Sequence, residues 1–289
     1  MIDYLILLRP RQWLKNVFIF AGLIFSRHFL DPGSIVDSAL AFIIFSLLSS
    51  GGYIFNDIID RKDDIAHPSK SKRPIAAGTI RPARAAVIAA VLIVCSLVAA
   101  FLLERSFFHV CVVYAVCMVL YSTAIKHIVL LDVMFVAFGY VLRAIAGAFV
   151  IGVEISSWLL ICTLLIALFL AVAKRRTELL ILGGNAAGHR RILADYSLPL
   201  LDQMIAIVTA SCIVAYCLYT LAPETVAKFG TKNLVFTVPF VIYGLFRYLY
   251  ITYQERHAGS PERVLFRDLP LQACLLGWIL ACVLILITA

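Results

Sequence analysis

Long apolar runs are the feature that most constrains how this chain can fold. A helix needs roughly 20 predominantly apolar residues to cross a bilayer. Nine stretches approach or reach that length, at about 14–30, 35–55, 84–104, 107–125, 129–151, 156–173, 201–222, 233–252 and 270–288. Within hydrocarbon every backbone N–H and C=O needs a partner from its own segment, which an α-helix supplies. We therefore predict an all-α integral membrane protein, a bundle of nine transmembrane helices.

The composition supports a single polytopic membrane domain over residues 1–289. Hydrophobic residues make up 63% of the chain and charged residues 15%, whereas soluble domains are near half apolar. The net charge of +8 would suit a nucleic-acid partner, but the basic residues lie in short connections between the apolar runs. The positive-inside rule accounts for such connections. We therefore predict contact with membrane lipid and no nucleic-acid partner.

The distribution of Lys and Arg predicts the orientation in the membrane. With a cytoplasmic N-terminus, 19 of the 25 Lys and Arg residues lie in cytoplasmic segments and 4 in outer segments. Basic residues are retained on the cytoplasmic side, so we predict a cytoplasmic N-terminus and an outer C-terminus. Two long connections, at about 56–83 and 174–200, then face the cytoplasm. We expect these two to be catalytic loops, so that the active site faces the cytoplasm from the cell's inner membrane.

Three aspartates follow the second apolar run at a helical spacing. Asp57, Asp60 and Asp64 stand at i, i+3 and i+7, with Asn56 one turn before Asp60, so a continuing helix puts them on one face. Crowded carboxylates repel one another unless a cation lies among them, and Mg²⁺ takes oxygen ligands and bridges carboxylates to substrate phosphates. The alternative is a solvated helix end whose acids pair with the neighbouring basic residues.

Basic residues follow in a segment that cannot form a long helix. Lys70, Lys72 and Arg73 lie in "HPSKSKRPIAAG", where Pro and Gly favour a loop. Carboxylates for a metal together with cations for oxygens suit diphosphate chemistry. The alternative is that these cations only set the membrane topology.

The segment "NDIIDRKDD", Asn56–Asp64, resembles the NDxxDxxxD motif of the UbiA superfamily of membrane prenyltransferases, and "RPIAAG" resembles the run that follows it there. Nine spans with the motif at the end of the second also resemble that family. The resemblance implies that Asp57, Asp60 and Asp64 are catalytic. It also implies that these aspartates and Asn56 hold Mg²⁺ against a substrate diphosphate.

The chain departs from that superfamily after the sixth run. Typical members have a second aspartate motif there, whereas this chain has "AVAKRRTELLIL", with Lys174, Arg175, Arg176 and a single nearby acid, Glu178. Replacing carboxylates by cations favours a phosphate held directly instead of through a second metal. The alternative is a stop signal that obeys the positive-inside rule.

This departure, with "LRPRQWLKN" at Leu8–Asn16, "YSTAIKHIVLLDV" at Tyr121–Val133 and "LRAIAGA" at Leu142–Ala148, resembles one branch, the decaprenyl-phosphate phosphoribosyltransferases. The resemblance implies Mg²⁺-dependent transfer of 5-phosphoribosyl from 5-phosphoribosyl 1-diphosphate to a polyprenyl phosphate, with release of diphosphate. Two alternatives stay open. One is prenyl transfer from a prenyl diphosphate to an aromatic acceptor, and the other is a non-enzymatic transporter.

The resemblance also suggests roles for the basic residues. Those of the first cytoplasmic loop, Lys70, Lys72 and Arg73, would clamp the phosphates of the donor. Those after the sixth run would grip a substrate phosphate, with Glu178 orienting an arginine.

Six further residues are candidates for lining the substrate cavity. Gln12, Lys15 and Asn16 form an i, i+3, i+4 face for ribose hydroxyls or phosphate, unless they are only one face of an interfacial helix. An intramembrane arginine is functional by default, so we assign Arg143 to the cavity, with a structural buried ion pair as the alternative. Tyr121 and Lys126, at the inner end of the fourth run, would face the cavity mouth.

Overall fold

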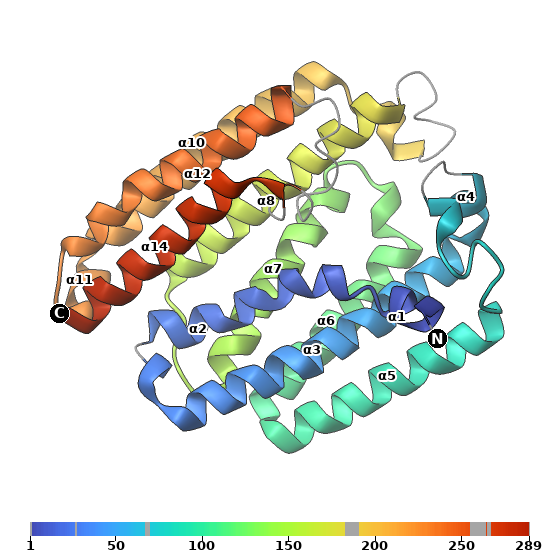
Figure 1. The fold of residues 1–289 in the computed structure, drawn as a ribbon, viewed down its shortest axis with the longest axis horizontal. Helices are drawn as coiled ribbons and strands as arrows, with labels where there is room; N and C mark the ends of the chain where they lie inside the picture. The colour runs from blue at the N-terminus through green and yellow to red at the C-terminus, as the bar shows by residue number, and fades with distance from the viewer. Residues whose placement is uncertain are drawn as a thin grey trace. The chain divides into compact units, whose positions relative to one another are not determined.

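The described part of the chain is built from helices. The computed structural model describes residues 2–26, 28–66, 70–182, 191–254, 264 and 267–288, and within these ranges every regular element is an α-helix or a 3-10 helix (Figure 1). Eight helical segments are long and apolar enough to cross a membrane. They are α3 (Pro32–Ile59), α5 (Pro82–Leu103), α6 (Arg105–Thr123), α7 (Leu131–Val150), α8 (Ser157–Leu182), α10 (Leu198–Leu221), η7 (Asn233–Thr237) continued by α12 (Val238–Gln254), and α14 (Leu269–Thr288). Each matches a predicted run, so the chain is a multi-pass membrane protein.

The remaining described elements are short. They are α1 (Ile2–Leu8), η1 (Pro10–Ile19), α2 (Phe20–Phe25), η2 (His28–Leu30), α4 (Arg61–Ala66), η3 (Lys70–Lys72), η4 (Ile125–His127), η6 (Arg191–Asp195) and α11 (Pro223–Phe229). The run predicted as the first span, 14–30, is therefore no single long helix, because it is divided among η1, α2 and η2. The structure does not confirm a ninth spanning helix.

The η1 and α2 segments lie in backbone contact with α7, and two glycines allow this approach. A Cβ atom added to Gly147 would lie 1.8 Å from the carbonyl oxygen of Ile19, and one added to Gly22 would lie 2.9 Å from the Cα of Ala148. Both distances are far below van der Waals contact. Gly147 therefore permits close packing, and the segment that it packs against is η1.

Helix α3 begins with a capped first turn and has small residues along its buried face. Asp31 accepts hydrogen bonds from the backbone N–H and the hydroxyl of Ser34, at 2.8 and 2.7 Å, and Pro32 occupies the first turn, where its missing N–H costs nothing. Further along, a Cβ at Gly51 would lie 2.7 Å from Ile93 Cγ1 of α5. Small residues at this contact let α3 approach its neighbour closely.

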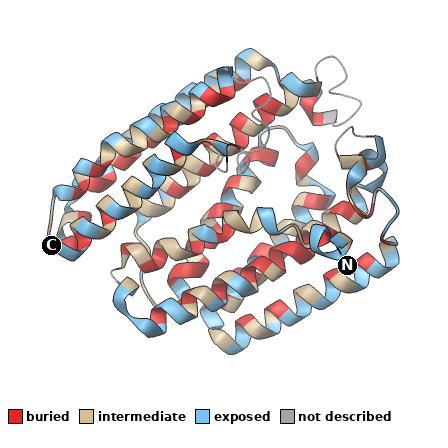
Figure 2. Ribbon diagram, viewed as in Figure 1, coloured by how far each residue is buried: buried red, intermediate tan, exposed pale blue. Residues whose placement is uncertain are grey.

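Helix α5 has an exposed apolar face. Helix α5 keeps four valines, Val87, Val91, Val94 and Val98, more than half exposed. Their spacing places them on one face. Because the helix is long and apolar, this face is suited to contact with lipid. Figure 2 shows the exposed and buried faces along the helices.

The described helices group into two compact units. The first comprises residues 1–155 and 185–195, and the second comprises residues 156–184 and 196–289. In the first unit α3 packs along α5, α6 and α7. In the second unit α8 packs against α10, and α12 packs against both α10 and α14.

One predicted boundary is wrong. The connection placed at about 174–200 begins later, because α8 continues as a helix to Leu182. Lys174, Arg175 and Arg176 are consequently residues of a helix instead of a loop. Carboxylates partner them there, Glu178 for Arg175 and Asp202 for Arg176, so the charges do not require the helix to end. Residues 183–190 of the predicted connection lie outside the described residues.

Candidate functional site

The predicted shared face of the aspartates is confirmed for two of the three. Helix α3 ends at Ile59, but Asp60 N–H bonds the Asn56 carbonyl at 2.9 Å and Asp64 N–H bonds the Asp60 carbonyl at 2.8 Å. Helical hydrogen bonding thus continues across the junction into α4. As a result Asp57 and Asp64 meet at one nitrogen: Arg73 Nη1 lies 2.9 Å from Asp57 Oδ1 and 2.6 Å from Asp64 Oδ2.

The third aspartate has a different set of partners. Asp60 accepts from Lys126 Nζ of η4 and, at 2.9 Å, from Asn56 Nδ2. Its side chain is 23% exposed, whereas those of Asp57 and Asp64 are 3% exposed. Asp63 is exposed, as the helical spacing predicts. We call Asp57, Asp60 and Asp64 together the aspartate cluster.

Arg9 completes the cluster, and the sequence prediction missed it. Its Nη2 donates to Asp57 Oδ1, and its guanidinium carbon lies 5.4 Å from the centre of the Tyr53 ring. The backbone of Arg9 is left-handed, with φ 52° and ψ 56°, a conformation that is costly for a residue other than glycine. That turn directs Arg9 toward α3. In the sequence Arg9 stands out only as one basic residue of "LRPRQWLKN".

Cations neutralise the cluster in this structure. Three carboxylates receive hydrogen bonds from three basic side chains, Arg9, Arg73 and Lys126. Burial raises the pKa of Asp64, and the charge of Arg73 and, more weakly, of Lys70 opposes that rise. The paired charges explain how aspartates persist at the end of a membrane helix, where isolated charges are costly.

The residues present fit a divalent cation in their chemistry. Carboxylate and amide oxygens from the aspartate cluster and Asn56 are the hard ligands that Mg²⁺ prefers. Within the described residues, however, no three His, Cys, Asp or Glu side chains are arranged together as a metal-binding group. Arg9, Arg73 and Lys126 hold oxygens that a metal would use, so a metal and these cations compete for the same carboxylates.

The predicted face of Gln12, Lys15 and Asn16 is only partly correct. These residues lie in η1, a 3-10 helix with about three residues per turn, so positions i and i+3 align and i+4 turns away. Gln12 and Lys15 are partly exposed, but Asn16 is fully buried. Asn16 Nδ2 donates to Ser46 Oγ at 2.9 Å. Asn16 is therefore engaged inside the first unit and leaves the proposed substrate face.

Arg143 lies at the centre of a buried network. Its Nε donates to Asn16 Oδ1 at 2.7 Å, its Nη1 to the Gly139 carbonyl at 2.6 Å and its Nη2 to the Tyr114 hydroxyl at 2.8 Å. The guanidinium carbon also lies 4.9 Å from the centre of the Tyr114 ring and 5.5 Å from that of Phe45. These neutral oxygens and rings stabilise the buried charge and join η1, α3, α6 and α7.

The remaining candidates of the first unit, Lys70, Lys72 and Tyr121, are all at least partly exposed. Lys70 is partly exposed and Lys72 exposed, both in η3, which ends directly before Arg73. Arg61 Nε donates to the Ile75 carbonyl at 3.4 Å, which ties α4 to the turn that follows Arg73. Tyr121 is partly exposed in the last turn of α6.

In the second unit, the residues Lys174, Arg175 and Arg176, here called the α8 basic cluster, are accompanied by acids. Arg175 Nη1 donates to Glu178 Oε2 at 2.6 Å, and Lys174 Nζ lies 4.0 Å from Glu178 Oε1. Arg175 is almost fully buried. Glu178 therefore has the geometry needed to orient an arginine.

The fold and these charges define a class: a polytopic, all-helical membrane protein with an ionic site where a membrane helix ends. Residues 16–269 match the model of the UbiA prenyltransferase family, and the chain belongs to this family.

Relatives and solved structures are consistent with that membership. The chain is 33% identical over 279 residues to a protein of Mycobacterium tuberculosis strain H37Rv named decaprenyl-phosphate phosphoribosyltransferase, which covers 94% of this chain and 90% of the relative. A Corynebacterium glutamicum protein of the same name is 31% identical over 282 residues, or 96% and 84% of the two chains. A structure of a UbiA homologue from Archaeoglobus fulgidus, bound to GPP and Mg²⁺, superposes with a TM-score of 0.74 at 18% identity and covers 98% of this chain and 99% of that one. The last likeness concerns the fold alone.

Proposed function

We propose that this protein transfers 5-phosphoribosyl from 5-phosphoribosyl 1-diphosphate to a polyprenyl phosphate of the decaprenyl type and releases diphosphate. The relatives named decaprenyl-phosphate phosphoribosyltransferase, at 31–33% identity over nearly the whole chain, support this reaction. The observation that carries the proposal is the equal mixture of the three carboxylates of the aspartate cluster with the three basic side chains that donate to them. Such a mixture can receive a metal on its acids and a diphosphate on its bases.

The residues of the first unit would act on the donor. The aspartate cluster and Asn56 would hold Mg²⁺, which when bound neutralises charge that develops on the departing diphosphate. Arg9, Arg73 and Lys126, released from the carboxylates, would donate to phosphate oxygens. Positive charge develops at the ribosyl C1 atom as its bond to the diphosphate breaks, and an oxygen of the acceptor phosphate would form the new bond there.

Other candidate residues would contact the rest of the two substrates. Lys70 and Lys72 would approach the donor's 5-phosphate, and Gln12 and Lys15 the ribose hydroxyls. The remaining candidates would border the cavity, and these are Tyr121 and Arg143.

The acceptor needs alignment more than a base. A phosphate monoester is already ionised near pH 7, so its oxygen can attack C1 without losing a proton to a side chain. The α8 basic cluster would grip that phosphate, with Glu178 holding Arg175 in position. Arginine is suited to this because its planar fork can bind two phosphate oxygens at once.

We further propose one polytopic domain in the cell's inner membrane, with nine crossings, a cytoplasmic N-terminus and active site, and an outer C-terminus. The ninth crossing would be η1 with α2. Ten residues of 3-10 helix and six of α-helix extend roughly 29 Å, close to the thickness of a bilayer core. The segments about 56–83 and 174–200, the second beginning with the last turns of α8, would face the cytoplasm. Reporter fusions that require export should be active after residue 289 and inactive after residue 66, and the opposite pattern would refute this orientation.

Activity should be tested on purified protein in detergent with Mg²⁺, radiolabelled 5-phosphoribosyl 1-diphosphate and decaprenyl phosphate. We expect labelled lipid to form, and the Asp57→Asn variant to lose at least about a hundredfold in rate, because one oriented charge in a site contributes this much. Asp63→Asn is the matched control, since this exposed carboxylate is only six residues away, and it should retain wild-type activity. Absence of labelled lipid, together with prenyl transfer from geranyl diphosphate to an aromatic acceptor, would contradict the proposal.

A binding measurement tests the competition between cations and metal separately from activity. Arg9→Gln removes a cation from Asp57, so Mn²⁺, used as a spectroscopic substitute for Mg²⁺, should bind more tightly than to wild type. Inorganic pyrophosphate should bind more weakly, because one phosphate donor is lost. Arg11→Gln, on an exposed side chain two residues further on, should change neither affinity. Weaker binding of Mn²⁺ to Arg9→Gln would show that Arg9 supports the metal site instead of competing with it.

A further inference from the structure

Three helix ends of the second unit are joined by one group of side chains. Arg176 of α8 donates through Nε to Asp202 Oδ1 of α10 at 2.6 Å. The hydroxyl of Tyr253, from the last turn of α12, donates to the same oxygen at 2.7 Å. The Arg176 guanidinium carbon lies 3.8 Å from the centre of the Tyr253 ring, so the arginine also stacks on it.

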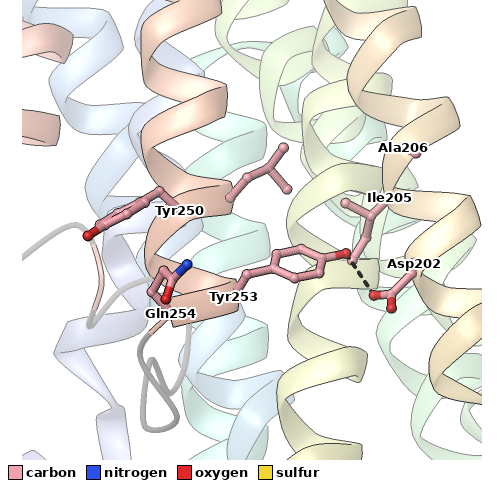
Figure 3. A pocket seen from close by; sticks show the side chains of 7 residues that line it. Asp202, Ile205, Ala206, Tyr250, Tyr253 and Gln254 are labelled. Carbon is pink, nitrogen blue, oxygen red and sulfur yellow. Dashed lines mark hydrogen bonds between the residues drawn. The ribbon is translucent and has the colours of Figure 1, made fainter.

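A shallow groove between α10 and α12 begins at this group. Figure 3 shows Tyr253 reaching from α12 to Asp202, beside Ile205 and Ala206 of α10. The groove has a volume of about 280 Å³ and is lined by Asp202, Ile205, Ala206, Leu249, Tyr250, Tyr253 and Gln254. Its walls are mainly hydrocarbon and aromatic rings. Asp202 is the one charged residue among the seven that line it, and Arg176 binds this carboxylate.

Arg176, beside the Asp202 end of the groove, offers further hydrogen-bond donors. The bond to Asp202 uses Arg176 Nε, and the guanidinium carries four further N–H donors on its two terminal nitrogens. The Arg176 side chain is 11% exposed. Lys174, two residues earlier on α8, is 40% exposed. The groove thus combines an apolar channel beside two membrane helices with a fixed arginine that can receive an anion.

We propose that this groove binds the hydrocarbon chain of the polyprenyl phosphate, with the phosphate at Arg176. The proposal rests on the proposed function and adds where the lipid substrate lies. A hydrocarbon chain can lie against the mainly apolar walls of this groove, which runs beside two membrane helices. A phosphate monoester carries close to two negative charges and can accept from both terminal nitrogens of one arginine.

The test compares two alanines of α10 that differ in one respect. Ala206 lines the groove, whereas Ala210, also exposed and one turn further along the same helix, does not. We expect Ala206→Trp to fill the groove and to weaken binding of decaprenyl phosphate in nanodiscs by at least about tenfold, without changing the KM for the donor. Ala210→Trp should bind the lipid as wild type does. Because tryptophan can impair folding, benzoylphenylalanine at 206 provides a second test, and it should crosslink to radiolabelled decaprenyl phosphate when the same group at 210 does not.

The head group is tested with Arg176→Gln and two lipids. This variant should bind decaprenyl phosphate more weakly and should lose the wild-type preference for decaprenyl phosphate over decaprenol. Wild-type affinity for decaprenyl phosphate in Ala206→Trp, or equal crosslinking from 206 and 210, would overturn the groove even if phosphoribosyl transfer is observed. Displacement of the bound lipid by phosphatidylglycerol at equal concentration would also overturn it, because the groove would then be a general site for anionic lipid. Crosslinking from 206 in a protein that makes no labelled product would support the groove and refute the proposed function.

Discussion

Replacing Tyr114 with Phe removes one hydroxyl from the network around Arg143 and leaves the ring in place. That hydroxyl accepts from Arg143 Nη2 at 2.8 Å, and a hydrogen bond to a charged group contributes roughly 1.5–3 kcal/mol. The phenyl ring can keep the 4.9 Å distance to the guanidinium carbon, so the cation–π attraction remains. We expect the free energy of unfolding to fall by about 2 kcal/mol.

Unfolding can be followed by titrating SDS into mixed micelles while recording circular dichroism. Tyr243→Phe is the control, because this tyrosine of α12 is 49% exposed and its replacement should change the free energy of unfolding by less than about 0.5 kcal/mol. An unchanged free energy of unfolding in Tyr114→Phe would refute the argument that this hydrogen bond stabilises the first unit.

Arg143→Met provides the other side of a double-mutant cycle. The substitution removes three hydrogen bonds, which lowers stability. It also removes the cost of burying the guanidinium charge, which is several kcal/mol and opposes that loss. The net loss should therefore be smaller than the sum of the three bonds. In the Arg143→Met background Tyr114→Phe should cost little, which gives a coupling energy of about 1–3 kcal/mol. Additive effects of the two substitutions would show that the two side chains do not interact.

Two further substitutions test close packing and charge at a helix start. Gly147→Ala would bring a methyl group within 1.8 Å of the Ile19 carbonyl oxygen. We expect this overpacking to lower the free energy of unfolding by about 1–3 kcal/mol or more. Gly244→Ala is its control, because the nearest atom lies at an ordinary 3.7 Å, and similar losses would contradict the packing. The hydrogen bond from Arg247 lowers the pKa of Asp268, so stability from this carboxylate is present above the unfolded pKa of about 3.9 and is lost as pH falls through the lower folded value. Asp268→Asn should flatten the decline in thermal stability below about pH 4, and an unchanged decline would refute the assignment.

Apolar length predicts eight of the membrane helices because each one satisfies its own backbone groups within hydrocarbon. It is a poor guide to the segment 14–30, where the chain forms η1 and α2. The structure of that segment depends on Gly22 and Gly147, which bring it into backbone contact with α7. Such a contact lies far apart in the sequence, and hydropathy contains no information about it.

The candidate site is also predictable from the sequence only in part. Spacing along one helix predicts that Asp57 and Asp64 share a face, because successive helical turns fix their relative positions. The recruitment of Arg9 depends on a left-handed turn in front of Pro10 and on the packing of α1 against α3. The predicted end of α8 is wrong because local charge favours a loop, whereas Glu178 and Asp202 pair with the arginines within the helix.

The two ionic sites differ in whether a phosphate needs a metal in order to bind there. In the aspartate cluster each carboxylate is matched by a basic side chain, so an added diphosphate needs a metal to replace the cations that leave the acids. At the end of α8, the described residues include three cations, Lys174, Arg175 and Arg176, and two acids, Glu178 and Asp202. Guanidinium groups can bind a phosphate directly. We therefore expect EDTA to abolish binding of inorganic pyrophosphate and to leave the affinity for decaprenyl phosphate within about twofold of its original value. Loss of both affinities on chelation would mean that the lipid phosphate also needs the metal, and the cations of α8 would then have no independent role in holding it.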